Sequence, residues 1–565
     1  MPRLQHLFLL CVLLIAPAAW ADEPPPLSVT LTPRPAADGG VDRLEVELRF
    51  PAPGGDAADA LLRMPVTLVS TPTAAYEAAD IQVRDGRGLL TLRAEDAEPT
   101  PEGVYRHYLA DRAAEGDVIV TYAVTPRPVS SETRNGPLFD LRAQDGGLMG
   151  AGVYFFALPV VETPYRITLT WDLSALPAGA RGVWSFGEGE RSVTAPASTL
   201  AFSFYAVGAV ASEPEAGADD FALYWLSQPP FDIDDLAAET RALYTYMSEF
   251  FNDPGAPYRV FIRENPYPAG GGTALAQSFM FGYGAGGETT SDGLQILLAH
   301  EMAHNWPRLN GGDPHALTAW YTEGTAEFYS SLLALRAGLL DFDEFLDIIN
   351  RRADAYYANP HISLSNEEAG QIFWSDSRAQ RIPYGRGFIY LANVDAQVRA
   401  ASDGARSLDD LVVTVLARQK AGETVGLTEW VAMVQAEIGD AAQADFDAMI
   451  SGQAITPHPQ SFAPCLRPVQ VSHRPFHLGF DEMRLGVVAD LLPESAAARA
   501  GLAEGDEILS ITPVREAQGA EDRMMEMTIR RDGRTYGVSY LPRGEPVSGW
   551  RWERVDGAPD SACAL

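Results

Sequence analysis

The chain has 565 residues, which predicts several domains, and its 46% hydrophobic and 21% charged residues exclude disorder as its main state. Its 76 acidic residues against 42 lysines and arginines give a formal net charge of -34, so we expect no nucleic-acid partner and no binding to anionic membrane surfaces. Three cysteines are too few for a disulfide scaffold.

Residues 1–21 have the features of an export signal. Arg3 precedes an apolar run that is too short to span a bilayer, and residues 19–21 read AWA, with small side chains at the two positions that a signal peptidase inspects. No later stretch reaches transmembrane length. We therefore expect a cleaved signal peptide and an exported protein, either periplasmic or secreted. In that oxidising compartment Cys465 and Cys563 either form a disulfide or stay apart, and both outcomes remain open.

Residues 22–212 predict an N-terminal domain that resembles a β-sandwich. Its segments are short, rich in β-branched residues and separated by glycine and proline. Residues 44–48 read LEVEL, a strict alternation, and parts of residues 117–124 and 166–171 alternate in the same way. The domain contains no cluster of catalytic side chains, so we interpret it as a scaffold.

The pattern changes to mixed helix and strand after residue 233. Apolar residues at helical spacing come first, residues 258–263 then read as a strand, and a glycine-rich loop is expected over residues 270–287. A helix is expected to begin near Gly293.

Residues 300–304 read HEMAH, an HExxH motif at the end of an apolar helical run. Residues four apart share one face of a helix, so the imidazoles of His300 and His304 can point at one metal ion. Glu301 lies one step round the helix, where its carboxylate can take the proton of a water molecule that zinc polarises. This spacing predicts metal-assisted hydrolysis.

A catalytic zinc ion needs a third protein ligand and one open position. Eighteen residues separate His304 from Glu323, and the turn NGGDP at residues 310–314 lets two helices fold back on each other. Glu323 is therefore the predicted third ligand. Asn310 stands where the HExxHxxGxxH pattern needs its third histidine, and His315, which follows a proline, is a weaker alternative.

Glu327 lies one helical turn beyond Glu323 on the same face. Its carboxylate either orients a ligand imidazole from behind or is an ordinary solvated acid of a helix. Both interpretations remain open from the sequence.

The spacing HExxH-x18-E, with WYTEG at residues 320–324, resembles the gluzincin metallopeptidases and, more narrowly, the glycyl aminopeptidase family. Residues 335–339 (LRAGL) and 407–410 (SLDD) are also similar to segments of that family. The resemblance implies a multidomain α+β protein with a thermolysin-like catalytic domain over residues 213–340 and a helical domain over residues 341–455. It also implies one Zn²⁺ ion and a peptide or protein substrate.

Residues 383–387 read PYGRG and are similar to the tyrosine segment that follows the third ligand in this family. The resemblance implies that the Tyr384 hydroxyl donates a hydrogen bond to the oxyanion of the tetrahedral intermediate. Without the resemblance, Tyr384 would read as a core residue that precedes an apolar helix.

The loop that binds the substrate's free amine in this family departs from its pattern here. The family has a Gly-Gly-x-Glu motif, whereas Gly271 and Gly272 are followed by Ala274 in place of the glutamate. The two glycines can still let a substrate backbone lie along the strand at residues 258–263, but a methyl group cannot hold an ammonium group. The exopeptidase activity therefore does not carry over by resemblance. Acids elsewhere that could substitute are Glu264, Glu288 and Asp292.

The helical region has two local signals. Phe342, Phe345 and Ile349 share one face of a helix, together with Leu346. Ser407 and Asp410 form a predicted capping pair ahead of another helix.

A proline-containing linker at residues 456–468 leads to the last predicted domain, residues 469–548, followed by a tail at residues 549–565. Residues 486–493 read as a strand and turn, residues 494–502 read as a short capped helix ended by glycine, and residues 505–511 read as a tight turn into a second strand. This order resembles a bacterial PDZ domain.

PDZ domains bind an extended peptide along a sheet edge, often through its C-terminal carboxylate. Residues 478–480 (LGF) are a candidate carboxylate loop. The predicted domain either binds such a C-terminal peptide or only packs against the catalytic domain.

The sequence as a whole predicts an exported zinc-dependent metallopeptidase, with aminopeptidase and internal peptide cleavage as rival activities because of Ala274. The alternative is an exported binding or scaffold protein in which the metal has a structural role.

Overall fold

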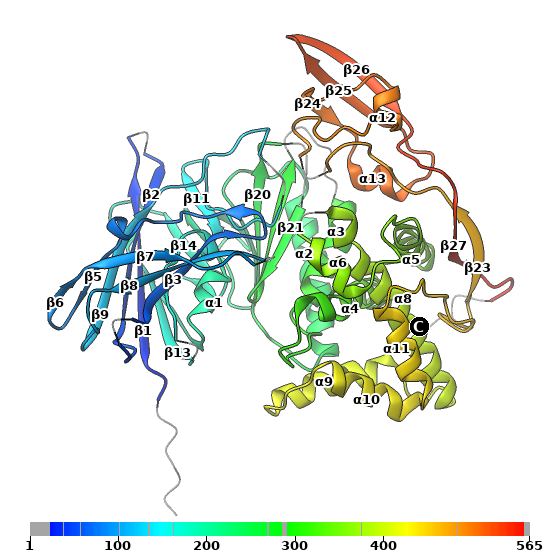
Figure 1. Ribbon diagram of the computed structural model, residues 1–565, viewed down its shortest axis with the longest axis horizontal. Helices are drawn as coiled ribbons and strands as arrows, with labels where there is room; N and C mark the ends of the chain where they lie inside the picture. Colours follow the sequence, from blue (N-terminus) through cyan, green and yellow to red (C-terminus); the bar gives the residue numbers. More distant parts are fainter. Residues whose placement is uncertain are drawn as a thin grey trace, which may run out of the picture.

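The computed structural model describes residues 23–558 apart from residues 38, 57, 101, 134–135, 162, 268–270, 285–290, 375 and 483. The export signal predicted at residues 1–21 lies outside the described residues. No helix in this part of the chain is long and apolar enough to cross a membrane. Sheets dominate the N-terminal half and helices follow, as expected for a multidomain α+β protein (Figure 1).

The N-terminal region consists of sheets that enclose one hydrophobic core. In β2 (Val41–Pro51) the side chains of Leu44, Val46 and Leu48 are buried while Glu45 and Glu47 lie on the other face, which confirms the predicted alternation. The remaining strands of this sheet, whose order is β16-β13-β1-β2-β9-β5-β6, are β16 (Arg191–Ala195), β13 (Tyr165–Trp171), β1 (Pro26–Pro35), β9 (Asp117–Val124), β5 (Gln82–Asp85) and β6 (Gly88–Leu90).

Two further sheets complete this region. One has the order β12-β3-β8-β7, with β12 (Leu158–Pro159), β3 (Ala60–Leu68), β8 (Gly103–Ala110), β7 (Leu92–Asp96) and, paired with β3, β4 (Thr71–Pro72). The other has the order β10-β11-β17-β14-β15, with β10 (Arg142–Gln144), β11 (Gly147–Ala151), β17 (Phe204–Gly208), β14 (Arg181–Trp184) and β15 (Gly187–Glu188). The short helical turns are η1 (Ala78–Asp80), η2 (Gly152–Tyr154) and α1 (Ser198–Ala201).

A mixed sheet follows, in the order β18-β19-β20-β22-β21. Its strands are β18 (Ala211–Glu213), β19 (Phe221–Trp225), β20 (Tyr258–Asn265), β22 (Ser278–Gly284) and β21 (Gly271–Leu275). The strand predicted at residues 258–263 is thus confirmed, and it lies parallel to both of its neighbours, β19 and β22.

The glycine-rich loop predicted over residues 270–287 is wrong for residues 271–284, which form β21, a tight turn and β22. Every residue of β22 is buried, because it carries the continuous apolar run Phe279–Phe281 between two other strands. Gly272 has a packing role, since a Cβ atom there would lie 2.1 Å from the Phe279 ring. The high glycine content of this segment thus led to the prediction of a loop where the chain forms a β-hairpin.

The helices pack against this sheet and against each other around a common core. They are α2 (Ile233–Phe250), α3 (Ser291–Ala303), α4 (His315–Arg336), α5 (Phe342–Tyr357), α6 (Asn366–Ile372), α7 (Ser377–Gln380), α8 (Ile382–Ala401), α9 (Leu408–Lys420), α10 (Leu427–Ile438) and α11 (Ala441–Ile450). Ser407 and Asp410 form the predicted capping box of α9, and Phe342, Phe345 and Ile349 of α5 are buried as expected. The catalytic and helical parts share one core, so the boundary drawn at residue 340 does not separate two cores.

The C-terminal part contains a sheet in the order β24-β25-β26 and a separate ribbon of two strands. The sheet comprises β24 (Glu507–Ile511), β25 (Met525–Arg531) and β26 (Arg534–Tyr540), with α12 (Ala496–Arg499) and α13 (Val514–Gly519) beside it, and the ribbon pairs β23 (Leu466–His473) with β27 (Val547–Arg554). The predicted short helix is present as α12, capped by Ser495, and the predicted second strand is β24. Residues 486–493, expected as a strand and turn, form no strand, and Val487 makes an isolated bridge with Glu507.

The ribbon ties this part to the helices. Trp552 of β27 exchanges backbone hydrogen bonds with the side chain of Asn350 in α5, and its ring is buried in the common core. The tail predicted from residue 549 therefore begins inside a strand. Cys465, directly before β23, is disulfide-bonded, whereas Cys563 lies outside the described residues.

Candidate active site

The HExxH motif lies at the C-terminal end of α3. This helix forms because Leu294, Leu298 and Met302 recur at helical spacing and are buried against the sheet and α4. His300 is in the last turn, and His304 directly follows the helix. The two ring centroids are 4.8 Å apart, with the ring planes nearly perpendicular.

Helix α4 brings Glu323 to both imidazoles. Glu323 Oε2 lies 3.2 Å from His300 Nε2 and 3.5 Å from His304 Nε2. The turn before α4 is held in place from outside, because the backbone N–H of Val425 donates to Asn310 Oδ1 at 2.7 Å and that of Leu427 donates to an oxygen of Asp313 at 3.1 Å. The structure thus brings together the three residues that the sequence selected as ligands.

These three side chains form a group that could hold a metal ion. One potential ligand atom from each of His300, His304 and Glu323 lies within 4.8 Å of the others. His315, the alternative third ligand, instead packs its ring against Phe373 and Trp374 at the start of α4.

The electrostatics of the group match a cation site. Burial alone would lower the pKa of His300, but the adjacent carboxylates of Glu323 and Glu327 raise that pKa to about 10. Burial lowers the pKa of His304 to about 4, so this imidazole is neutral at pH 7 and has a lone pair for a metal. Burial opposes ionisation of Glu323, yet the two histidines lower its pKa. The site therefore attracts positive charge, which a proton on His300 supplies when no metal does.

Glu327 is placed behind His300. Its Oε1 atom lies 3.1 Å from His300 Nδ1, while Arg352 of α5 pairs with its other carboxylate oxygen. The Arg352 guanidinium also donates to the hydroxyls of Ser331 at 2.6 Å and Ser330 at 2.9 Å. Burial would raise the pKa of Glu327, but Arg352 and His300 lower it to about 2. An ionised Glu327 next to His300 Nδ1 favours a proton on that nitrogen, and Nε2 on the other side of the ring faces Glu323.

Arg352 was missed from the sequence, although a signal for it exists. It lies three residues after Ile349 and seven after Phe345, both fully buried, and therefore on the buried face of α5. An arginine on the apolar face of a helix needs a buried acidic partner, and Glu327 is that partner.

Tyr384, in the first turn of α8, stacks on His300 with ring centroids 5.5 Å apart and planes 9° from parallel. Burial and the charges of nearby Glu323 and Glu301 raise the pKa of Tyr384 well above its ordinary value. The phenol therefore keeps its proton and can donate a hydrogen bond. The charge of Glu301 also raises the pKa of His300, so Glu301 lies near both rings.

Glycines in two motifs set the position of Tyr384 relative to Glu323. Helices α4 and α8 cross with their backbones in contact: a Cβ atom on Gly324 would lie 2.5 Å from the backbone of Gly387, and one on Gly387 would lie 2.0 Å from the Trp320 carbonyl oxygen. Larger side chains would push the helices apart. Gly324 of WYTEG and Gly387 of PYGRG are thus required by the crossing.

Gly271 and Gly272 lie on β21, which is an edge of the sheet among the described strands. The expectation that a substrate lies along the strand at residues 258–263 is wrong, because β20 is central and already paired on both sides. Along β21, Leu275 packs against the N-terminal core while Ala274 packs against the core that contains α3. Ala274 therefore lies on the side of β21 that faces the helices of the candidate active site.

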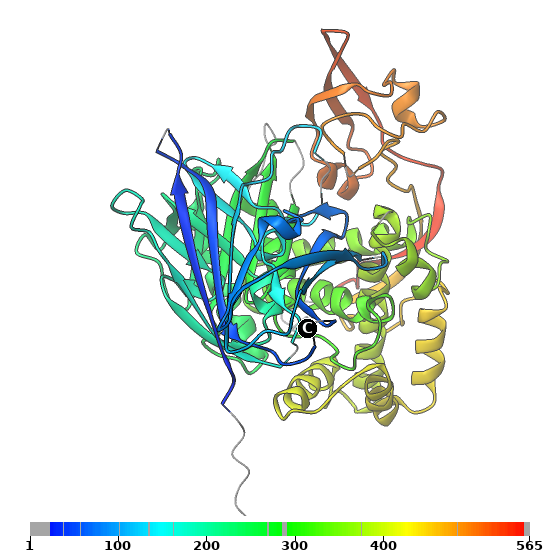
Figure 2. The ribbon, with the colours of Figure 1, turned by 60° about the vertical axis from the view of Figure 1, so that its left-hand side comes forward.

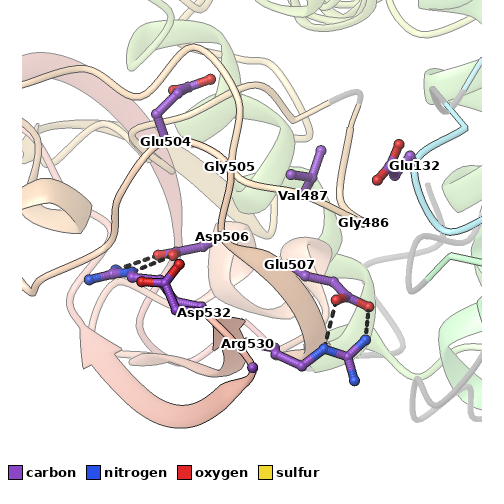
Figure 3. Close-up of a pocket in the computed structure, with 11 residues that line it drawn as sticks. Glu132, Gly486, Val487, Glu504, Gly505, Asp506, Glu507, Arg530 and Asp532 are labelled. Carbon is purple, nitrogen blue, oxygen red and sulfur yellow. Dashed lines mark hydrogen bonds and ion pairs between the residues drawn. The ribbon is translucent and has the colours of Figure 1, made fainter.

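A pocket in the C-terminal part is lined by none of the candidate active-site residues. It has a volume of about 390 Å³ and lies between that part and Glu132 of the N-terminal region (Figure 3). Its arginines are already paired, Arg530 with Glu507 and Arg531 with Asp506. It adds no residue to the candidate active site.

Comparison with known proteins shows similarity at the level of fold. No protein family model matches the sequence, and no curated protein is significantly similar to it. An aminopeptidase N family protein from Idiomarina loihiensis has a similar structure, with a TM-score of 0.63 and 14% identity over 95% of this chain and 99% of that one. An M1 zinc metallopeptidase from Deinococcus radiodurans gives a TM-score of 0.45 and 17% identity over 77% of this chain and 95% of that one.

Leukotriene A4 hydrolase from Saccharomyces cerevisiae gives a TM-score of 0.48 and 14% identity over 77% of this chain and 69% of its own. Of these similarities, the first covers nearly the whole of both chains and is the one that compares complete architectures. The chain therefore has the fold of the aminopeptidase N family protein, with two histidines and a glutamate converging within it.

Proposed function

We propose that the protein is a zinc-dependent peptidase that hydrolyses peptide bonds. The observation that carries this proposal is the convergence of His300 Nε2, His304 Nε2 and a Glu323 oxygen. Two imidazoles and one carboxylate are the donor set of a catalytic zinc site, which keeps a fourth position open. The charge also fits, because the carboxylates of Glu301, Glu323 and Glu327 exceed the one guanidinium of Arg352 by two negative charges, which one Zn²⁺ ion balances.

Each residue has a defined role in this reaction. A bound zinc ion would polarise water and the scissile carbonyl group. Glu301 takes the proton from the attacking water and passes it to the leaving amine. The protonated Tyr384 donates a hydrogen bond to the oxygen on which negative charge develops. Glu327 and Arg352 hold His300 in the orientation that ligation needs.

The position of cleavage within the substrate depends on β21. An edge strand offers unpaired backbone groups to an extended peptide, and Gly271 and Gly272 present no side chain that would obstruct it. Because Ala274 cannot hold an ammonium group, internal or N-blocked peptides are as good candidates as peptides with a free N-terminus. We also propose that the protein is exported, on the evidence of the signal-like residues 1–21. A PDZ-like domain is proposed from the sequence pattern of residues 486–511.

The decisive experiment substitutes Glu301→Gln and measures zinc content together with turnover of an alanyl anilide and of an N-acetylated peptide. We expect zinc to be retained and turnover to fall by about 100- to 10,000-fold. Glu249→Gln, an exposed acid of α2, is the matched control and should change neither quantity.

The ratio of the two wild-type rates separates aminopeptidase from internal cleavage. A wild-type protein that binds zinc but hydrolyses neither substrate would support the alternative, a binding protein with a structural metal. Biological activity that is indifferent to Glu301→Gln would support it too.

A further inference from the structure

The C-terminal module, defined here as residues 476–543, contacts two segments that lead into the candidate active site. In both ribbon views it lies at one end of the helices, with α13 on the side that faces them (Figure 1, Figure 2). One contacted segment precedes the edge strand β21, and the other precedes Tyr384.

The first contact is made by Tyr267, which follows β20. Its side chain is only 1% exposed because it packs into the core of the module with residues such as Phe480 and Val488. From the N-terminal region, Arg142 lies over the Tyr267 ring at 5.8 Å. The module is thus held against the sheet that carries β21.

The second contact is made by Arg381, between α7 and α8. Its guanidinium donates to Glu482 Oε2 at 2.7 Å. It also donates to the side-chain oxygen of Gln518 in α13, at 2.5 and 3.0 Å, with that amide turned so that its oxygen faces the arginine. The Glu482 side chain is 15% exposed and that of Arg381 is 42% exposed. Two elements of the module therefore bind the residue that precedes α8.

Packing holds the first turn of α8, where Ile382 and Pro383 are buried. Arg381 is its N-cap residue, and no side chain caps the helix there. Two residues after Tyr384, Arg386 is fully buried and donates to the carbonyl oxygens of Ile362 and Leu364 and to Asn366 Oδ1. Tyr384 lies between the two arginines. Arg386 is anchored within the helical part of the chain, and Arg381 is anchored to the C-terminal module.

We propose that the C-terminal module positions Tyr384 for catalysis, with Glu482 acting through Arg381. The inference rests on the proposed function, since the tyrosine matters only where an oxyanion forms. A shift of about 1 Å in such a group can cost a large part of its catalytic effect. Arg381 and Glu482 are positioning residues, because neither touches the reacting atoms.

Charge reversal tests the proposal. Arg381→Glu and Glu482→Arg are each expected to lower kcat about fivefold to tenfold with KM within twofold of wild type, and the double reversal should recover most of the loss. In a Tyr384→Phe background, Glu482→Arg should lower kcat by less than twofold, because its effect passes through the missing hydroxyl. The matched control, Glu507→Arg, breaks the pair with Arg530 in the same module and should leave kcat unchanged (Figure 3).

Hydrogen–deuterium exchange gives a readout that needs no activity. Glu482→Arg should speed exchange of the amides at residues 382 and 384–386, whereas Glu507→Arg should not. Unchanged kcat and exchange in both reversals, or a loss that simply multiplies with that of Tyr384→Phe, would overturn the proposal. Faster exchange in a protein without peptidase activity would retain the coupling and reject the proposed function instead.

Discussion

Two buried clusters of charge in this protein differ in sign. The acid cluster at the candidate active site combines Glu301, Glu323 and Glu327 with Arg352. The arginine cluster, at the contact between the N-terminal region and the mixed sheet, consists of Asp140 and the arginines at positions 127, 142 and 263. Among the described ion pairs, all three of these guanidinium groups share the one carboxylate.

The difference follows from what each group can bind. Guanidinium groups donate in many directions, so Arg142 binds Asn265 and the Tyr267 hydroxyl in addition to Asp140, and Arg263 also binds the Asp140 carbonyl oxygen. An arginine surplus is thus satisfied by neutral acceptors. In the acid cluster, Glu323 and Glu327 face the imidazoles of His300 and His304 and the guanidinium of Arg352, so their surplus of negative charge favours an added proton or a cation. The arginine cluster is complete as a joint between domains, whereas the acid cluster is complete only with added positive charge.

Removing the one acid of the arginine cluster should have the largest effect on stability. Asp140 is 1% exposed, and Asp140→Asn would leave Arg142 and Arg263 buried without a counter-charge. We expect a destabilisation of about 3 to 5 kcal/mol, measured by urea unfolding. Asp117→Asn, which breaks the exposed pair with Arg49, is the control and should change stability by less than about 1 kcal/mol. Equal effects of the two substitutions would show that burial does not separate these pairs.

Weakening the acid cluster should lower metal affinity before it lowers stability. Glu327→Gln and Arg352→Met should each reduce zinc affinity about 10- to 100-fold, because both release the orientation of His300. Competition with a chromogenic chelator measures the effect directly. The double variant should lose little more than either single variant, since the two act in series. Full additivity would mean that Arg352 does not act through Glu327.

The sequence predicted Glu301 and the three candidate metal ligands, but neither Arg352 nor the arginine cluster, and the reason is distance along the chain. His300 and His304 are four residues apart on one helix, and Glu323 follows a recognisable turn, so local spacing specified all three. Asp140 and Arg263 are 123 residues apart and meet only because β10 and β20 belong to sheets that pack together. No local pattern contains that information.

The burial of strand β22 could also not be predicted from local sequence patterns. The alternation in β2 and the cap of α9 were predicted, because each depends on neighbouring residues. The hairpin of β21 and β22 was not, because its glycines are explained by close packing against Phe279 and not by chain flexibility. The sequence also did not reveal that β20 is a central strand. Because β20 is paired on both sides, β21 replaces it as the candidate strand for substrate binding.

The pH dependence of stability should distinguish the clusters further. Burial would raise the pKa of Asp140, but the three arginines lower it to about 2, below the value of 3.8 expected in the unfolded chain. A lowered pKa gives stability that is complete above about pH 5 and is lost as the pH falls towards 2. We expect the stability difference between wild type and Asp140→Asn to shrink by about 2 kcal/mol over that interval. A constant difference would contradict the assigned ionisation.

The smallest expected effect concerns the periphery of the arginine cluster. The Arg127 side chain is 23% exposed and lies 3.3 Å from Asp140, whereas Arg142 is buried and lies 3.0 Å from it. Arg127→Met should therefore cost less than about 1 kcal/mol in urea unfolding, because water solvates its charge in both states. Arg142→Met should cost several times more, since it removes the buried donors to Asp140 Oδ2 and to Asn265 Oδ1. If Arg127→Met proved as costly as Arg142→Met, the cluster would need all three positive charges, and its comparison with the acid cluster would rest on charge and not on hydrogen bonding.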